Sequence, residues 1–250
     1  MEKKNIWFIT AKTNLHVGDE NTSSYGLIDK AVQRDALTGL PCINSSSLKG
    51  ALNEYCCNGN KGKEFLNSET RIKIFGSDKT GTNKDAKKGS YIFFDAKILF
   101  LPVQNDDTLF HWATSKGVLD RFRKQMKLFG IELNEDNNSL IKELKTTLGL
   151  KNRIDVKKSD KEFEELCSDN NLPIIARNYL ENGMSSNLWY EQILPAETVF
   201  YTIIDDKKDG KLFEKLGKQD SFVQIGANAT IGYGYCKFKT FKENSNEQNQ

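Results

Sequence analysis

The chain has 250 residues, 38% of them hydrophobic and 28% charged, and this balance argues against a disordered protein. No run approaches about 18 apolar residues and the first residues lack the apolar stretch of a signal peptide, so we expect a cytoplasmic protein with no membrane partner. Five cysteines without a CxxC pair suit a reducing compartment, and with only two histidines they do not offer the clustered ligands of a zinc site.

The first part of the chain predicts a strand, a long loop and a helix. Residues 5–12 are rich in β-branched and aromatic types, which favour a strand. Residues 15–46 lack periodicity, and loops of this length inside a compact domain are usually functional. Ser45 or Ser46 then caps a helix over 47–57. The apolar residues on one face of this helix are Leu48, Ala51, Leu52 and Tyr55.

The middle of the chain begins with a local excess of positive charge. The net charge is only +2, but residues 71–90 carry six Lys/Arg against two Asp, within a basic loop over 76–90. A solvated charged loop remains the alternative to a phosphate-binding surface. Residues 91–103 predict a strand, 115–129 an amphipathic helix, and 131–170 a helical insertion with weak core signals.

A hairpin is predicted in the last third. The runs 173–180 and 187–194 alternate in polarity on either side of a polar tip over 181–186 that contains Asn-Gly, a common hairpin turn. The remaining expected elements are a strand over 198–204, a short helix over 208–216, a strand over 236–241 and a disordered tail over 242–250.

The order of these elements predicts an α+β fold. A strand, a helix, further strands, a helix and a final strand are compatible with a split βαβ sheet of the RNA-recognition-motif (ferredoxin-like) type. We expect one domain over 1–241, with insertions at about 15–46, 60–90 and 131–194, the last including the hairpin over about 173–194.

A serine-rich turn that opens the helix after residue 44 is the first candidate binding site. Ser46 and Ser47 offer hydroxyls, free backbone N–H groups and the partial positive charge of a helix start to an anion. Lys49 in the first turn is unfavourable for the helix dipole unless a phosphate lies nearby. A serine cap beside a surface lysine is the alternative interpretation.

A glycine-rich block near the end is the second candidate. Gly226, Gly232 and Gly234 allow the backbone to lie close to a ligand, and Tyr233 between two of them could stack on a base. A tight turn before a strand would use the same residues.

Taken together and in order, these blocks resemble the RAMP superfamily of CRISPR proteins, and within it the backbone subunit of the type III-B (Cmr) effector complex. The segments that carry the resemblance are His16-Val17-Gly18, Ile28-Asp29, Gln33-Arg34-Asp35, Thr38-Gly39, Ser46-Ser47-Leu48-Lys49-Gly50, Leu188-Trp189-Tyr190-Glu191, Gln224-Ile225-Gly226-Ala227-Asn228 and Thr230-Ile231-Gly232-Tyr233-Gly234. The matches span roughly residues 6–240. The chain departs from the family at Ala31 and Ala229, where the family has Pro and Glu.

The resemblance implies a subunit that polymerises along guide RNA as a helical filament and cuts paired target RNA with a divalent metal ion, Mg or Mn. Further copies of the chain and other Cmr subunits, including the large, the small and the guide 5′-end-binding subunit, are the implied partners. The hairpin would act as a thumb that pushes a base out at regular intervals. Asp29 is the implied general base or metal ligand, and His16 a second catalytic residue. The implied RNA-binding residues are Gln33, Arg34, Ser46, Ser47, Lys49, Arg177, Met184, Gly226, Asn228, Gly232, Tyr233 and Gly234.

Several alternatives remain open. The chain could be the type III-A equivalent, a guide-processing endonuclease of the same superfamily, or a guide-RNA-binding subunit without catalytic activity. At the residue level, His16 could be a hydrogen-bonded structural residue, Asp29 could serve a turn or a cap, and Met184 could simply be exposed on a turn.

Overall fold

The computed structural model describes residues 5–18, 28–58, 66–77, 86–206, 210–212, 216 and 222–241. The predicted tail over 242–250, the centre of the basic loop and most of the helix predicted over 208–216 lie outside these residues. Within the described ranges, no helix is both long enough and apolar enough to cross a membrane.

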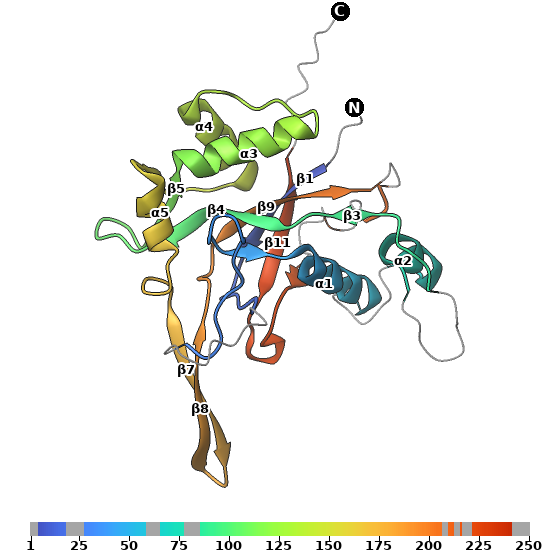
Figure 1. Ribbon diagram of the computed structural model, residues 1–250, viewed down its shortest axis with the longest axis vertical. Helices are drawn as coiled ribbons and strands as arrows, with labels where there is room; N and C mark the ends of the chain where they lie inside the picture. Colours follow the sequence, from blue (N-terminus) through green and yellow to red (C-terminus); the bar gives the residue numbers. More distant parts are fainter. Residues whose placement is uncertain are drawn as a thin grey trace, which may run out of the picture.

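One large sheet forms the centre of the molecule (Figure 1). Its strands are β1 (Asn5–Ala11), β2 (Cys42–Ile43), β3 (Ile92–Phe93), β4 (Ala96–Val103), β5 (His111–Ser115), β6 (Ile154–Lys157), β9 (Val199–Asp205), β10 (Phe222–Gln224) and β11 (Tyr235–Thr240). Their order is β10-β11-β1-β9-β4-β5-β6, with β2 paired to β4 and β3 paired to β9. From β11 to β4 every neighbouring pair is antiparallel.

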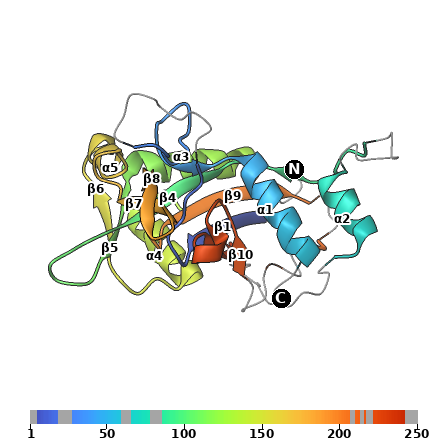
Figure 2. The same ribbon diagram turned by 90° about the horizontal axis from the view of Figure 1, so that it is seen from below.

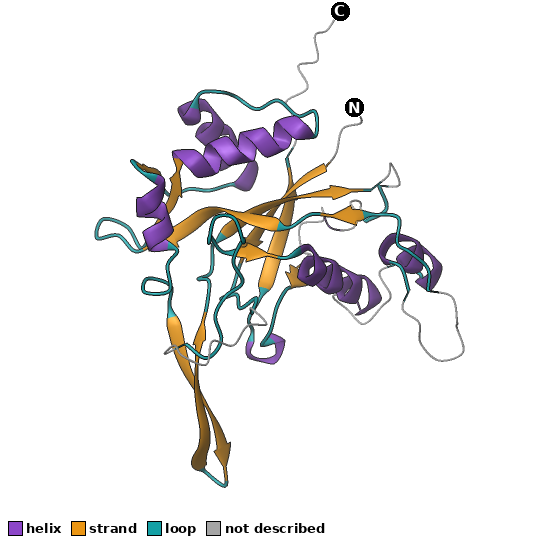
Figure 3. Ribbon diagram, in the orientation of Figure 1, coloured by secondary structure: helices purple, strands orange, loops and turns teal. Residues whose placement is uncertain are grey.

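Helices flank this sheet, so the predicted α+β class is confirmed (Figure 3). They are α1 (Ser45–Asn58), α2 (Ser68–Phe75), α3 (Lys116–Leu128), α4 (Asn137–Leu148) and α5 (Asp160–Leu166), with a short 3-10 turn, η1 (Ala229–Ile231). Successive residues of β1 point to opposite faces, and both are covered. The ring of Phe8 lies 6.0 Å from that of Phe122 on α3, and Trp7 lies 6.1 Å from Phe238 on β11. Burial on both faces explains why β1 is almost continuously apolar.

Most predicted elements are confirmed, but some require correction. Helix α1 begins at Ser45, so Ser45 and Ser46 lie inside the helix that either of them was predicted to cap. The strand expected over 91–103 is broken into β3 and β4, because residues 94 and 95 leave the ladder and the register with β9 shifts. The insertion over 131–170 is not weakly packed: Leu140, Leu144 and Phe163 are fully buried. It also contains β6, which pairs in parallel with β5 and extends the sheet.

The predicted hairpin is confirmed and projects away from the large sheet (Figure 1). It consists of β7 (Ile174–Glu181) and β8 (Met184–Gln192). Asn182 and Gly183 have φ of 54° and 81°, the left-handed values that a two-residue hairpin turn requires. The turn is therefore shorter than the polar tip expected over 181–186, and the extra residue is taken up by a register shift after Tyr179.

Candidate functional site at the base of the hairpin

Three segments that are distant in sequence meet where the hairpin leaves the body of the protein. They are the residues after β1, the segment 28–44, and the loop between β10 and β11. Seen from below, the hairpin projects toward the viewer beside the last of these (Figure 2). The contacts below define this junction, which we call the hairpin base.

Asp29 is exposed but is not on a free loop. Its backbone N–H donates to the carbonyl of Tyr190 at 3.0 Å, and its carboxylate Oδ2 accepts from the Tyr190 N–H at 2.7 Å. The carbonyl of Lys30 accepts from Gln192 N–H at 2.9 Å. Residues 29–30 thus run beside β8 like a short additional strand, and the Asp29 carboxylate is directed to the β8 backbone.

Two cations lie over the indole ring of Trp189 close to this point. Lys30 Nζ is 5.2 Å and the Arg177 guanidinium carbon 5.5 Å from the ring centroid, distances at which cation–π attraction operates. The indole N–H is buried and has no hydrogen-bond partner within the described chain. The hairpin base therefore gathers positive charge around Trp189, the residue before the Tyr190 that holds Asp29.

Glu191 is a buried carboxylate, only 1% exposed, that joins three segments. It accepts a hydrogen bond from Arg177 on β7 at 3.2 Å and one from the Asn228 amide in the loop after β10. His16 Nδ1 lies 3.7 Å away. A buried charge requires such partners, so these contacts fix Arg177 and Asn228 in place.

His16 is itself buried, at 3% exposure. Its Nδ1 lies 2.7 Å from the Gln192 carbonyl oxygen, and its own carbonyl accepts from the Ala227 N–H at 2.9 Å. These contacts agree with the structural alternative for His16. The catalytic assignment stays a prediction.

The glycine-rich loop is shaped mainly by close backbone contacts. A Cβ on Gly226 would lie 2.2 Å from the carbonyl oxygen of His16, and a Cβ on Gly234 would lie 2.0 Å from that of Ile225. Both glycines have positive φ. Gly232 also has positive φ, but it is exposed and faces open space, and the neighbouring Tyr233 is half-buried. The close contacts of Gly226 and Gly234 agree with the tight-turn alternative, and the RNA-binding assignments of the three glycines stay predictions.

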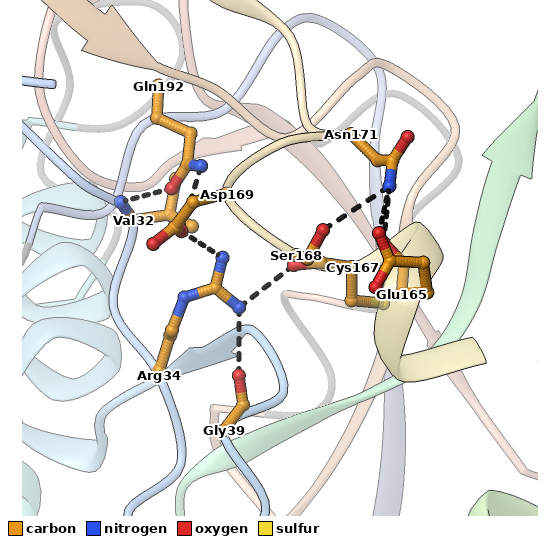
Figure 4. A network of polar contacts seen from close by, with 9 residues as sticks. All are labelled: Val32, Arg34, Gly39, Glu165, Cys167, Ser168, Asp169, Asn171 and Gln192. Carbon is orange, nitrogen blue, oxygen red and sulfur yellow. Dashed lines mark hydrogen bonds and ion pairs between the residues drawn. The ribbon is translucent and has the colours of Figure 1, made fainter. Parts of the chain in front are cut away.

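Arg34 and Gln33 make contacts within the chain. The Arg34 guanidinium donates to the carbonyls of Gly39 and Cys167 at 2.8 and 2.9 Å and to Asp169 at 2.6 Å (Figure 4). The side-chain oxygen of Gln33 accepts from the backbone N–H of residue 44 at 2.7 Å. An RNA contact by either side chain would compete with these bonds.

The start of α1 and the hairpin turn lie apart from these contacts. Helix α1 begins at Ser45, whose backbone N–H donates to the Asp95 carboxylate at 2.7 Å, so one of the free groups predicted for an anion is already taken. Ser46 is exposed, and Ser47 and Lys49 are half-buried in the same first turn. Met184 is 72% exposed at the first position of β8.

Asp29 is the exposed carboxylate that the hairpin base offers to a metal ion, because Glu191 is buried. Within the part of the chain that the structure describes, no group of three or more His, Cys, Asp or Glu side chains could hold a metal. Asp29 has one oxygen bonded to Tyr190 and could offer the other. Mg²⁺ is commonly held by one or two carboxylates together with substrate phosphates, so these residues fit an ion that is bound jointly with RNA.

The sequence interpretation missed Lys30, Glu191, Gln192 and Asp169. Tyr190 and Glu191 belong to the segments that carry the resemblance, but the motif predicts no role for them. The signal present in the sequence is an acidic residue followed by an amide, Glu191 and Gln192, near the end of a run that otherwise alternates in polarity. Their partners could not be identified, because all of them are distant in sequence.

Comparison with known proteins identifies the class to which this chain belongs. The family model of the RAMP superfamily matches residues 8–237. The chain therefore belongs to the RAMP superfamily, as the sequence motifs indicated.

Within this superfamily the chain is similar to the CRISPR system Cmr endoribonuclease Cmr4 of Pyrococcus furiosus. The two are 30% identical over an alignment of 277 positions, gaps included, which covers 88% of this chain and 90% of the relative. The crystal structure of oligomeric Cmr4 from P. furiosus superposes with a TM-score of 0.70 at 25% identity, covering 96% of this chain and 98% of that one. A chain of the type III-B Cmr-beta complex bound to cognate target RNA has the same fold, with a TM-score of 0.69 at 19% identity and the same coverage.

Proposed function

We propose that this chain is the backbone subunit of a type III-B CRISPR effector complex, which binds guide RNA and cleaves the paired target RNA. The similarity to an endoribonuclease over most of both chains supports this function. The observation that carries the proposal is the exposed residue Asp29, whose carboxylate is held by Tyr190 at the base of a projecting hairpin, next in sequence to a Trp189 ring that lies under two cations.

The central sheet would be an RNA-recognition-motif-like palm. The order β11-β1-β9-β4, antiparallel throughout, with α1 between β1 and β4, is the arrangement of a split βαβ fold. The hairpin would be the thumb, with Met184 near its tip as an adaptable wedge against bases of any sequence. Guide phosphates would lie at the start of α1, where Lys49, Ser46 and Ser47 are found. The partners would be guide RNA, target RNA, further copies of the chain and the other Cmr subunits.

Asp29 would act on a target nucleotide that the thumb has distorted. Such distortion can place the 2′-oxygen in line with the adjacent phosphorus. Oδ2 is engaged by Tyr190, so Oδ1 would take the 2′-hydroxyl proton as the 2′-oxygen attacks. The 5′-oxygen of the next nucleotide leaves with a proton from water, giving a 2′,3′-cyclic phosphate and a 5′-hydroxyl. In the alternative role, Asp29 supplies one ligand to a divalent ion, Mg or Mn, that would neutralise charge on the phosphate.

The decisive experiment replaces Asp29 with Asn. An amide oxygen can still accept from the Tyr190 N–H, so the segment keeps its place while the basic carboxylate is lost. We expect Asp29→Asn to lower single-turnover cleavage of end-labelled target by about 10²-fold or more, with assembly and target affinity unchanged. Wild-type cleavage with and without a chelator tests the metal. A mutant that cuts at the wild-type rate would remove Asp29 from the mechanism and favour another residue.

A catalytically inactive guide-binding subunit is the second candidate. It would be indicated if wild-type complex bound target with unchanged affinity in all conditions but left it intact in the presence of Mg or Mn.

A further inference from the structure

The side chain of Gln192 connects the Asp29 segment to a remote turn. Gln192 is completely buried at the end of β8. Its amide oxygen accepts from the Val32 N–H at 3.1 Å, and its amide nitrogen donates to Asp169 Oδ1 at 3.1 Å (Figure 4). A primary amide can satisfy both neighbours only in this orientation, so the acceptor at residue 169 determines which way it faces.

Asp169 lies in the turn after α5 and binds a second group. The same Oδ1 accepts from Arg34 at 2.6 Å, while Arg34 also donates to the carbonyl of Cys167 in that turn. Partial burial works to raise the pKa of Asp169, but the hydrogen bonds from Gln192 and Arg34 and the guanidinium charge hold it below its ordinary value. Asp169 is therefore ionised at neutral pH and is hydrogen-bonded to both Gln192 and Arg34.

These contacts continue the short ladder that holds Asp29. Along this segment the Asp29 N–H donates to Tyr190, the carbonyl of Lys30 accepts from Gln192, and the Val32 N–H then meets the Gln192 side chain instead of a backbone carbonyl. The Gln192 amide is thus the last rung of the ladder. Asp169 binds the Gln192 amide directly. It also binds Arg34, which lies two residues after Val32 in the same segment.

We infer that Asp169 is a positioning residue that holds the Asp29 segment against the hairpin base and so aligns the Asp29 carboxylate for target cleavage; this inference rests on the function proposed above. Nothing in the sequence motifs or in the comparisons gives Asp169 this role.

The sign of the charge separates this role from RNA binding. The carboxylate of Asp169 is 59% exposed. Removing a negative charge near RNA leaves phosphate binding unchanged or strengthens it, because the local potential becomes more positive. Loss of positioning would instead lower the cleavage rate. Asp169→Ala is therefore expected to lower the cleavage rate while the affinity for RNA stays equal or rises.

The test compares three variants in the assembled complex. Asp169→Ala should reduce single-turnover cleavage by about tenfold or more, since displacements of about 1 Å can cost as much as 10²-fold, while target affinity is equal or higher. Asp169→Asn keeps an acceptor for Gln192 and Arg34 and should retain most of the rate. Glu164→Ala is the control, because Glu164 is an exposed carboxylate near that turn with no hydrogen bond or ion pair from its side chain within the described chain.

Amide hydrogen exchange gives a second readout that does not require cleavage. Asp169→Ala should accelerate exchange in peptides covering residues 29–34, and Glu164→Ala should not. If wild-type complex does not cut RNA, the proposed function fails, and exchange alone decides the inference. Equal cleavage and equal exchange in Asp169→Ala and wild type would overturn it, as would an equal loss of cleavage in Asp169→Ala and Glu164→Ala.

Discussion

Asp35 shows how one carboxylate can organise a turn of the chain. Its Oδ1 accepts from the backbone N–H of Leu37 at 3.2 Å and from the N–H and hydroxyl of Thr38 at 2.9 and 2.8 Å. Lys97 and Arg121 lie 3.6 and 3.9 Å from the carboxylate. Burial raises the pKa of Asp35, but the hydrogen bonds from Thr38 and the two cations lower it below its ordinary value.

This lowered pKa predicts a pH-dependent contribution to stability. Because the folded state favours the ionised carboxylate, the contribution is complete above about pH 4, the unfolded pKa, and is lost as the pH falls through the lower folded pKa. Asp35→Asn should lower the Tm by about 2–4 °C near pH 7, and the difference should shrink toward about pH 3. Thermal unfolding of the full chain checks this, with Asp106→Asn on an exposed loop as the control. A Tm difference that stays constant with pH would contradict the assignment.

The residues of the site could be predicted only in part. The motif around Asp29 indicates a segment that the fold brings to the hairpin base, because a carboxylate within a long aperiodic loop is visible in sequence. The roles of Glu191 and Gln192 could not be predicted, since their partners Arg177, Asn228 and Asp169 are brought to them only by the folded hairpin and sheet.

Among the elements, the hairpin turn gives the clearest prediction. Gly183 has φ of 81°, a value that costs a β-branched residue roughly 1–2 kcal/mol. Gly183→Val should therefore loosen β7 and β8 near the turn without changing the Tm of the body, because the outer hairpin residues are exposed. We expect faster amide exchange in the hairpin and loss of evenly spaced target cleavage. Ser185→Ala is the matched control. A normal ladder of products from Gly183→Val, seen on a denaturing gel, would exclude the thumb from setting the cutting interval.

The elements themselves were largely predictable where their pattern was strong. The Asn-Gly turn and the amphipathic helix α3 follow from local chemistry and periodicity. The strand β6 has only four residues, and its pairing with β5 depends on an α3–α4 connection that no local pattern reveals. The first residues of β8 are exposed and mostly polar, and this composition predicts a loop because an exposed strand carries no burial signal.

At the scale of the whole molecule, the fold gives different surroundings to two basic residues for which the sequence predicts the same role. Both Lys49 and Arg34 were expected to contact guide phosphate. Lys49→Ala should lower the slope of log affinity against log salt for guide RNA by about 0.7, the value for one contact with a single strand. Arg34→Ala should change this slope little and reduce cleavage instead, because its guanidinium is bonded to Asp169 and two carbonyls. Salt titrations of both variants measure this. Equal decreases in slope for the two variants would show that Arg34 contacts guide phosphate.

The junction at the hairpin base has a consequence for the order of events during synthesis. His16 and Gln192 are 176 residues apart in sequence, and Asp29 and Tyr190 are 161 apart. A ribosome delivers the N-terminal partner of each pair first, and a contact of such high sequence separation has to wait until its C-terminal partner has been made. A nascent chain that has not yet reached β8 therefore has no hairpin base at all. The site proposed for RNA cleavage therefore forms only after β8 has been made, and we expect nascent chains shorter than this to lack it.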